Sequence, residues 1–197
     1  MHKFNIGSLL VAAVFGLTSS VSAQSASLFS LQGSALYENV QGDAFQWRQG
    51  SLPKGYGGEI QLRYNPGWIS WGGGVQATSH SWTDAQDDWN LRQIGVFLEP
   101  RYVIPSAGKA APYLSARLAL TTLKLKISEQ DIGDATGEAI NAGGGVLIAL
   151  TPRMNLDLGA TFGYTHFGDL QQNGAATGLK TGSGTNLIAR VGLAIGI

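Results

Sequence analysis

The stretch from Met154 to Thr165 alternates strictly between apolar residues and polar or very small ones, and this pattern constrains the fold most. Because successive side chains of a β-strand point to opposite faces, one face of this strand is apolar and the other is not. A helix would repeat its apolar residues every three or four positions instead. An apolar, glycine-rich run at 143–150 and a proline-containing turn at 151–153 come just before it, which predicts a β-hairpin.

The same alternation recurs along the chain, with connections that are alternately short and long. The predicted strands cover about residues 28–37, 56–64, 68–79, 91–104, 112–124, 138–150, 154–165 and 186–197. The long polar connections are Glu38 to Lys54, His80 to Asn90, Lys126 to Gly137 and Phe167 to Gly184. Each strand has roughly the ten residues that a tilted strand needs to cross a bilayer. The pattern therefore predicts an all-β fold, an eight-stranded antiparallel up-and-down transmembrane β-barrel.

Two positions disturb this pattern. Pro100 lies inside a predicted strand, where a proline cannot donate to the ladder, so we expect a local irregularity. Leu123 and Leu125 fall out of phase with the apolar residues before them, so we expect a bulge or a fading strand there.

The N-terminus has the features of an export signal. His2 and Lys3 precede an apolar core at 6–17, and small residues at 21–23 offer a cleavage site before Gln24. A core of about a dozen residues is shorter than the roughly 20 that a membrane-spanning helix needs, although a retained anchor is the alternative. We therefore predict a signal peptide at 1–23, a barrel domain at 24–197 and a location in the cell outer membrane.

Composition indicates which face of the strands points outward. A soluble, secreted, lipocalin-like barrel also alternates, but its apolar face points inward and its outer face needs many charges. Charged residues make up only 13% of this chain, against roughly 25% in ordinary soluble domains. The polar phase is mostly Gly, Ser, Gln, Asn and Thr, and residues this small fit the crowded lumen of an eight-stranded barrel. We therefore expect the apolar face to contact lipid, with the lipocalin-like barrel as the alternative.

A few charged residues fall on the polar, inward phase. They are Glu59, Arg63, Glu99, Arg101, Arg117, Asp157 and Arg190. Their charges nearly balance, as buried charges must if they are to be paired. The sequence thus predicts a salt-bridge network that fills the lumen and leaves no wide pore. The alternatives are a substrate-binding lumen and a narrow ion-conducting channel.

Aromatic residues lie near both ends of the predicted strands. Tyr64, Trp68 and Tyr102 fall at the short-turn ends, and Tyr37, Tyr56 and Tyr164 fall at the long-loop ends. Two such groups are typical of the aromatic girdles at the two membrane interfaces.

Three stretches carry a resemblance to a known family: Phe97 to Tyr102, Gly143 to Thr151 and Asn155 to Tyr164. With the topology, they make the mature chain resemble the small eight-stranded outer-membrane barrels, namely the OmpA transmembrane domain and OmpX-like porin-family proteins. The resemblance implies assembly by the outer-membrane barrel insertion machinery. In that family the machinery recognises a last strand that ends in an aromatic residue, whereas this chain ends in Ile197.

Some barrels of this size are enzymes that act on lipid A. A deacylase-like site would need a histidine and a serine two residues apart on one strand face, with a carboxylate to orient the histidine. His80 is followed directly by Ser81, which points to the opposite face, and His166 has Gly168 where the serine would be needed. We therefore expect no enzyme and place both histidines at the outer rim; a lipid-modifying enzyme is the alternative.

The sequence gives little support for cofactors. The chain has no cysteine, so it has no disulfide and no thiolate metal site. The acidic residues Glu129, Asp131, Asp134 and Glu138 lack the spacing of a calcium loop, so we expect no metal and no cofactor.

The expected partners follow from location and charge. Lys and Arg number 13, as do Asp and Glu, which gives no electrostatic case for nucleic acid. A second acidic group (Asp84, Asp87 and Asp88, beside Trp82 and Trp89) is expected to be a solvated rim, or a patch for a surface partner or lipopolysaccharide. We expect a monomer that contacts outer-membrane lipid and lipopolysaccharide and whose loops serve envelope stability or surface interaction.

Overall fold

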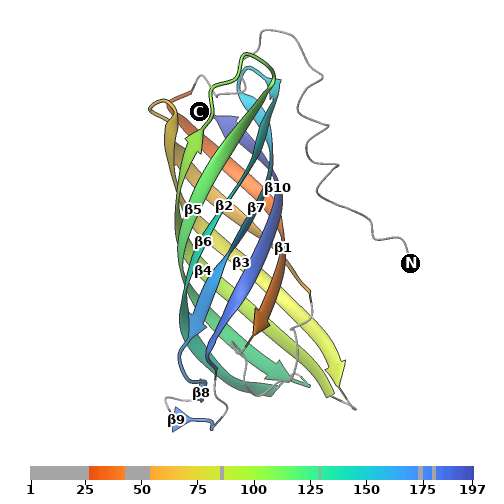
Figure 1. Cartoon of the computed structure of the whole chain (residues 1–197). Helices are drawn as coiled ribbons and strands as arrows, with labels where there is room; N and C mark the ends of the chain where they lie inside the picture. Colours follow the sequence, from red (N-terminus) through yellow and green to blue (C-terminus); the bar gives the residue numbers. More distant parts are fainter. Residues whose placement is uncertain (1–26, 43–53, 85–86, 129, 173–174, 179–180) are drawn as a thin grey trace, which may run out of the picture.

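Eight long antiparallel strands form a closed, tilted barrel (Figure 1). The computed structural model describes residues 27–42, 54–84, 87–128, 130–172, 175–178 and 181–197. The strands are β1 (Phe29–Gly42), β2 (Gly55–Tyr64), β3 (Ile69–Asp84), β4 (Asp87–Val103), β5 (Ala110–Ile127), β6 (Gln130–Thr151), β7 (Met154–Phe167) and β10 (Ser183–Gly196). Two short strands, β8 (Gln171–Gln172) and β9 (Ala175–Ala176), form a small ribbon beside β6. The predicted fold class is confirmed.

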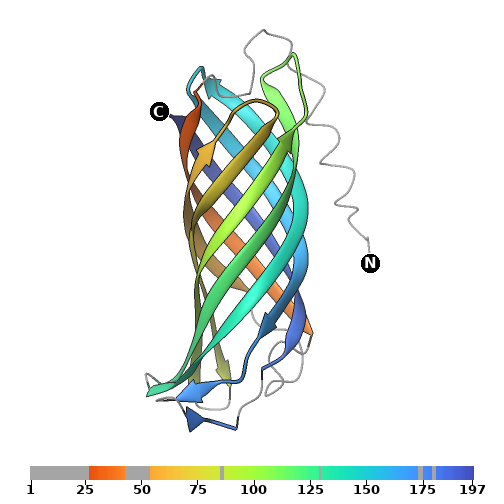
Figure 2. The same cartoon turned by 90° about the vertical axis from the view of Figure 1, so that its left-hand side faces the viewer.

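The ring closes through two pairings, β1 with β10 and β5 with β6. Closure leaves no open sheet edge along the wall, so the backbone polar groups of the wall bond within the barrel. The C-terminus lies at the end with the short turns, and β8 and β9 lie at the opposite end (Figure 2). Among the described residues, no helix is long and apolar enough to cross a membrane. The predicted signal peptide at 1–23 lies outside the described residues.

The burial pattern shows which face of each strand points outward. Ile60 on β2 and Val75 on β3 are 59% and 54% exposed, whereas their polar neighbours Gln61 and Gln76 are 1% and 7% exposed. The buried face of the central wall is thus the polar face, as expected for a barrel in lipid. The lipocalin-like alternative requires the reverse and is contradicted.

Several strands are longer than predicted, and the long connections between them are correspondingly shorter. β1 continues to Gly42, β3 to Asp84 and β5 to Ile127, and β6 already begins at Gln130. The prediction ended each strand where its apolar phase ended. A ladder needs only paired backbone groups, so it continues into the polar region beyond the lipid-facing band.

The prediction for Leu123 and Leu125 was partly wrong. Both side chains are fully buried on the inward phase of β5, in phase with Tyr113 and Arg117. The strand does not slip here; its inner face changes from polar to apolar. A register shift against β6 does follow, between Leu125 and Lys126.

The irregularity expected at Pro100 is present on one side of β4. Pairing with β3 is continuous, with Pro100 opposite Trp71. Pairing with β5 is interrupted between Leu98 and Arg101, because a proline has no N–H to donate.

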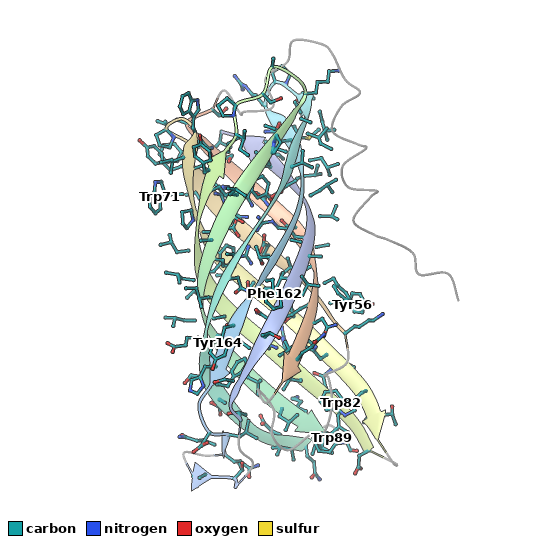
Figure 3. All side chains as sticks on the ribbon, viewed as in Figure 1. Tyr56, Trp71, Trp82, Trp89, Phe162 and Tyr164 are labelled. Carbon is teal, nitrogen blue, oxygen red and sulfur yellow. The ribbon has the colours of Figure 1, made fainter. Side chains whose placement is uncertain are left out.

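The six predicted interfacial aromatics lie on the outer surface or at its edge. Tyr56, Tyr64, Trp68, Tyr102 and Tyr164 are exposed, and Tyr37 is half-buried, with its ring 5.7 Å from that of Tyr56. Figure 3 shows Tyr56 projecting from the wall, with Trp71 and Phe162 as two further outward aromatics. Their role as membrane girdles stays a prediction.

Candidate functional site

The centre of the lumen contains a cluster of charged side chains, which we call the charge cluster. Its members are the seven predicted residues Glu59 and Arg63 (β2), Glu99 and Arg101 (β4), Arg117 (β5), Asp157 (β7) and Arg190 (β10). None is more than 4% exposed. Each lies on the inward phase of its strand, so the alternation of five strands is what brings them together.

Glu99 is the hub of the charge cluster. Its Oε1 lies 2.7 Å from Arg101 Nε and 3.3 Å from Arg63 Nη1. Its Oε2 lies 2.6 Å from Arg117 Nη2 and 2.6 Å from Arg190 Nη1. One carboxylate therefore contacts all four guanidinium groups.

The other two carboxylates connect the same cations. Asp157 Oδ2 lies 2.8 Å from Arg101 Nη2 and 3.5 Å from Arg190 Nε. Glu59 contacts Arg117 at 2.8 Å and Arg190 at 3.7 Å. Arg63 has Glu99 as its single carboxylate contact among the described residues. Breaking a buried pair leaves an uncompensated charge and is costly, so the cluster behaves as a unit.

Neutral residues complete the network, and the prediction did not assign them to it. Tyr113 donates its hydroxyl to Asp157 Oδ1 at 2.6 Å and accepts from Arg190 Nη2 at 3.0 Å. Gln32 Nε2 donates to Asp157 Oδ2 at 2.6 Å, and Arg63 donates to Ser70 Oγ at 2.8 Å. All three neutral residues lie on the inward phase, so the alternation could have identified them.

Two aromatic rings pack against the cations inside the barrel. The Arg117 guanidinium carbon lies 4.0 Å from the centre of the Phe97 ring, and that of Arg101 lies 4.5 Å from the centre of the Tyr113 ring. Such contacts are attractive and are stronger when desolvated. Gly159 makes room for Tyr113, because a Cβ at this glycine would collide with the phenol oxygen.

A second polar group lies nearer the long-loop end. Glu38 Oε2 accepts from Thr78 Oγ1 at 2.6 Å and lies 3.5 Å from His80 Nε2. His80 is fully buried, so its assignment to the outer rim was wrong. The strand continues past His80 and keeps it on the inward phase.

The long-loop end of the lumen is filled by apolar side chains, which we call the apolar seal. Its members are Val40, Leu91, Leu123, Leu125, Ala135, Phe167 and Leu170. Trp82 and Trp89 pack against it, with their rings stacked 5.7 Å apart (Figure 3). The prediction placed these tryptophans on a solvated rim. The extended β3–β4 hairpin instead holds them half-buried against the seal.

The outer rim holds a pair of residues that a search along single strands could not find. His166 on β7 and Ser183 on β10 are register partners, and Ser183 Oγ lies 2.8 Å from His166 Nδ1. Glu138 is the register partner of His166 on the other side, but no ion pair joins the two in the described part of the chain. An apolar hollow of about 530 Å³ adjoins them, lined in part by Leu118 and Ile140.

The acidic loop residues lie apart from any metal-binding geometry. Asp131, Asp134 and Glu138 are exposed along β6, and Glu129 lies outside the described residues. Asp88 accepts from Thr83 Oγ1 at 2.8 Å, and Asp87 accepts from Ser128 Oγ at 3.1 Å. Within the described ranges, no three acidic, histidine or cysteine side chains are grouped to hold a metal ion.

Comparison with known proteins gives the family. A profile of the family described as "Outer membrane protein beta-barrel domain" matches residues 9–186. The chain belongs to this family. Its members are outer-membrane barrels, which places this barrel in the outer membrane and supports the predicted resemblance.

Two solved structures illustrate the similarity. The barrel is similar to Neisserial surface protein A, with a TM-score of 0.64 and 21% identity, covering 87% of this chain and 98% of that one. It is also similar to Ail, the attachment invasion locus protein of Yersinia pestis, with a TM-score of 0.51 and 12% identity, covering 85% of this chain and 97% of that one. At these identities the likeness shows the fold alone. A search of the curated proteins found no match.

Proposed function

We propose that this barrel is a non-enzymatic, non-conducting outer-membrane protein whose extended outer hairpins serve envelope stability or surface interaction. The observation that carries the proposal is the two-layer filling of the lumen. The charge cluster occupies the centre, and the apolar seal occupies the long-loop end. Ion flow would need a continuous water path through both layers.

The outer surface supports the same proposal. The outward phase of β4 is apolar up to Ile94 and polar from Arg92, and that of β5 changes between Leu120 and Thr122. The paired strands continue well beyond this boundary, to Trp89 opposite Ile127. The wall on the short-turn side of this boundary contacts lipid. The hairpin ends on the long-loop side are therefore the surface available to partners.

Several predictions from the sequence belong to this proposal. The leader at 1–23 is cleaved after export, the insertion machinery assembles the barrel, and the mature protein is a monomer. Lipid and lipopolysaccharide are its immediate surroundings, because the apolar outward band faces the bilayer.

Single-channel recording tests whether the lumen is closed. The mature chain, inserted in a planar bilayer, is expected to show no steady ohmic conductance. Leu123→Ser places a hydroxyl in the seal and is expected to produce transient openings. The matched control Leu118→Ser changes an outward residue and is expected to remain closed. Steady conductance of the wild-type chain would refute the proposal and support the narrow channel.

The proposed role of the hairpins is tested in cells. A chain in which Asn-Gly replaces residues 83–88 loses the end of the β3–β4 hairpin and keeps Trp82, Trp89 and the apolar seal. We expect it to reach the outer membrane but to leave the cells more sensitive to large hydrophilic antibiotics, or less able to bind a surface partner. Unchanged behaviour in both assays would contradict the proposed role.

Hydrolysis of a lipid ester is a second candidate, favoured by the contact between His166 and Ser183 beside an apolar hollow. A serine bonded to a histidine is the arrangement of an activated nucleophile. Micellar ester hydrolysis that is lost in Ser183→Ala would support this candidate. An inactive wild-type chain supports the non-enzymatic proposal.

A further inference from the structure

The charge cluster contains one more cation than anions. Four guanidinium groups, of Arg63, Arg101, Arg117 and Arg190, contact three carboxylates, of Glu59, Glu99 and Asp157. An arginine remains protonated in proteins, so the cluster has a formal charge of +1 when the carboxylates are ionised. A buried charge without a counter-charge is strongly unfavourable.

Glu38, the remaining buried carboxylate among the described residues, is too far from Arg63 to pair with it. It is the register partner of Gly55, which lies eight residues before Arg63 on β2. At about 3.4 Å per residue the separation along the strand is roughly 27 Å. Glu38 has its own partners, Thr78 and His80.

The excess is greatest at the short-turn end of the cluster. Arg63 has a single carboxylate contact there, at 3.3 Å, to a group that it shares with three other arginines. Arg63 and Arg101 border a cavity of about 30 Å³. No carboxylate lines this cavity in the described part of the chain.

The rest of the cavity lining is partly apolar, from Val103, Leu147 and Ala194, and partly neutral polar. Its lining includes the hydroxyls of Ser30 and Ser70 and the amides of Gln32, Asn65 and Asn155. Asn65 belongs to the turn between β2 and β3, so the cavity adjoins the mouth of the lumen at that end. Its volume suits a water molecule or two, or a single monatomic ion.

We propose that this cavity is a binding site for a chloride ion, which supplies the missing counter-charge of the charge cluster. Arg63 already donates to Gln61 Oε1, Ser70 Oγ and the Glu99 backbone oxygen, so it attracts the anion through its charge, and the hydroxyls of Ser30 and Ser70 donate to it. This inference goes beyond the proposed function, because neither the closed lumen nor the role of the hairpins depends on it.

Chloride NMR tests the site directly. The refolded mature chain in non-ionic micelles is titrated into sodium chloride, and the width of the ³⁵Cl resonance is followed. We expect the chain to broaden the resonance more than bare micelles do, and added bromide to reduce this broadening by displacing the bound chloride. Arg63→Met removes the surplus cation, and Ser30→Leu fills the cavity while keeping every charge; each should reduce the broadening at least tenfold.

The matched control is Arg92→Met, which removes an exposed guanidinium from the outer surface and should retain the broadening. The proposal is overturned if the wild-type chain broadens the resonance no more than bare micelles do, or if Arg63→Met broadens it as much as wild type. Where the variants do not fold, crystals of the wild-type chain soaked in bromide decide the question. An anomalous peak beside Arg63 supports the site, and a featureless cavity refutes it.

Discussion

Replacing Glu99 by glutamine removes the one carboxylate that contacts all four arginines of the charge cluster. Arg101 and Arg190 would keep Asp157, and Arg117 would keep Glu59. Arg63 would be left without a carboxylate partner among the described residues. Breaking a buried pair costs about 3–5 kcal/mol, so we expect Glu99→Gln to lower the free energy of unfolding by at least about 3 kcal/mol.

Glu59→Gln is the matched comparison. It removes contacts to Arg117 and Arg190, but both cations keep Glu99, so no arginine is left alone. The expected loss is about 1.5–3 kcal/mol, the range for a hydrogen bond to a charged group. Adding Arg63→Met to Glu99→Gln removes the stranded cation and should recover part of the loss.

The assay is urea unfolding of the barrel in lipid vesicles, followed by tryptophan fluorescence. Wild type, Glu99→Gln, Arg63→Met and the chain with both changes form a double-mutant cycle from which the coupling of Glu99 to Arg63 is obtained. The reasoning is refuted if Glu99→Gln costs no more than Glu59→Gln, or if Arg63→Met further destabilises the Glu99→Gln chain.

Three further outcomes are expected. Leu123→Ala in the apolar seal should lower the free energy of unfolding by about 2–5 kcal/mol, and Leu118→Ala on the lipid face by clearly less; equal losses in urea titrations would contradict the seal. Gly159→Ala should cost about 1–3 kcal/mol by displacing Tyr113, and a stability equal to wild type would disprove the close fit. A spin label at position 60 should be accessible to oxygen dissolved in lipid and one at 61 should not; the opposite pattern would reverse the outward face.

The wall of the barrel was predictable because its environment imposes a simple rule. Lipid outside and a narrow lumen inside give each strand a period of two, and composition decided the outward face. The seven charged residues followed from the same alternation. The alternation also places Tyr113 and Gln32 on the inward face. It does not predict their hydrogen bonds to Asp157, which join β5 and β1 to β7.

The predicted strand ends and side-chain directions were wrong beyond the lipid-facing band, where an apolar residue no longer marks the outward face. Beyond the lipid-facing band the outward residues become polar, so the apolar phase no longer marks a strand, although pairing continues. Leu123 and Leu125 were interpreted as a change of phase because apolar residues were expected to face outward only. His80 was placed at the rim because the predicted strand ended at residue 79, where its apolar phase ends, whereas β3 continues to Asp84.

The sequence alone determined that this chain forms a closed barrel with its apolar face outward, because alternation and composition are properties of each strand taken separately. Only the tertiary structure decided which side chains meet across the lumen and around the rim. The contacts from Glu99 to four arginines, the apolar seal and the pair His166 and Ser183 all join strands far apart in the chain. Their geometry depends on the register and closure of the ring, which no single strand encodes.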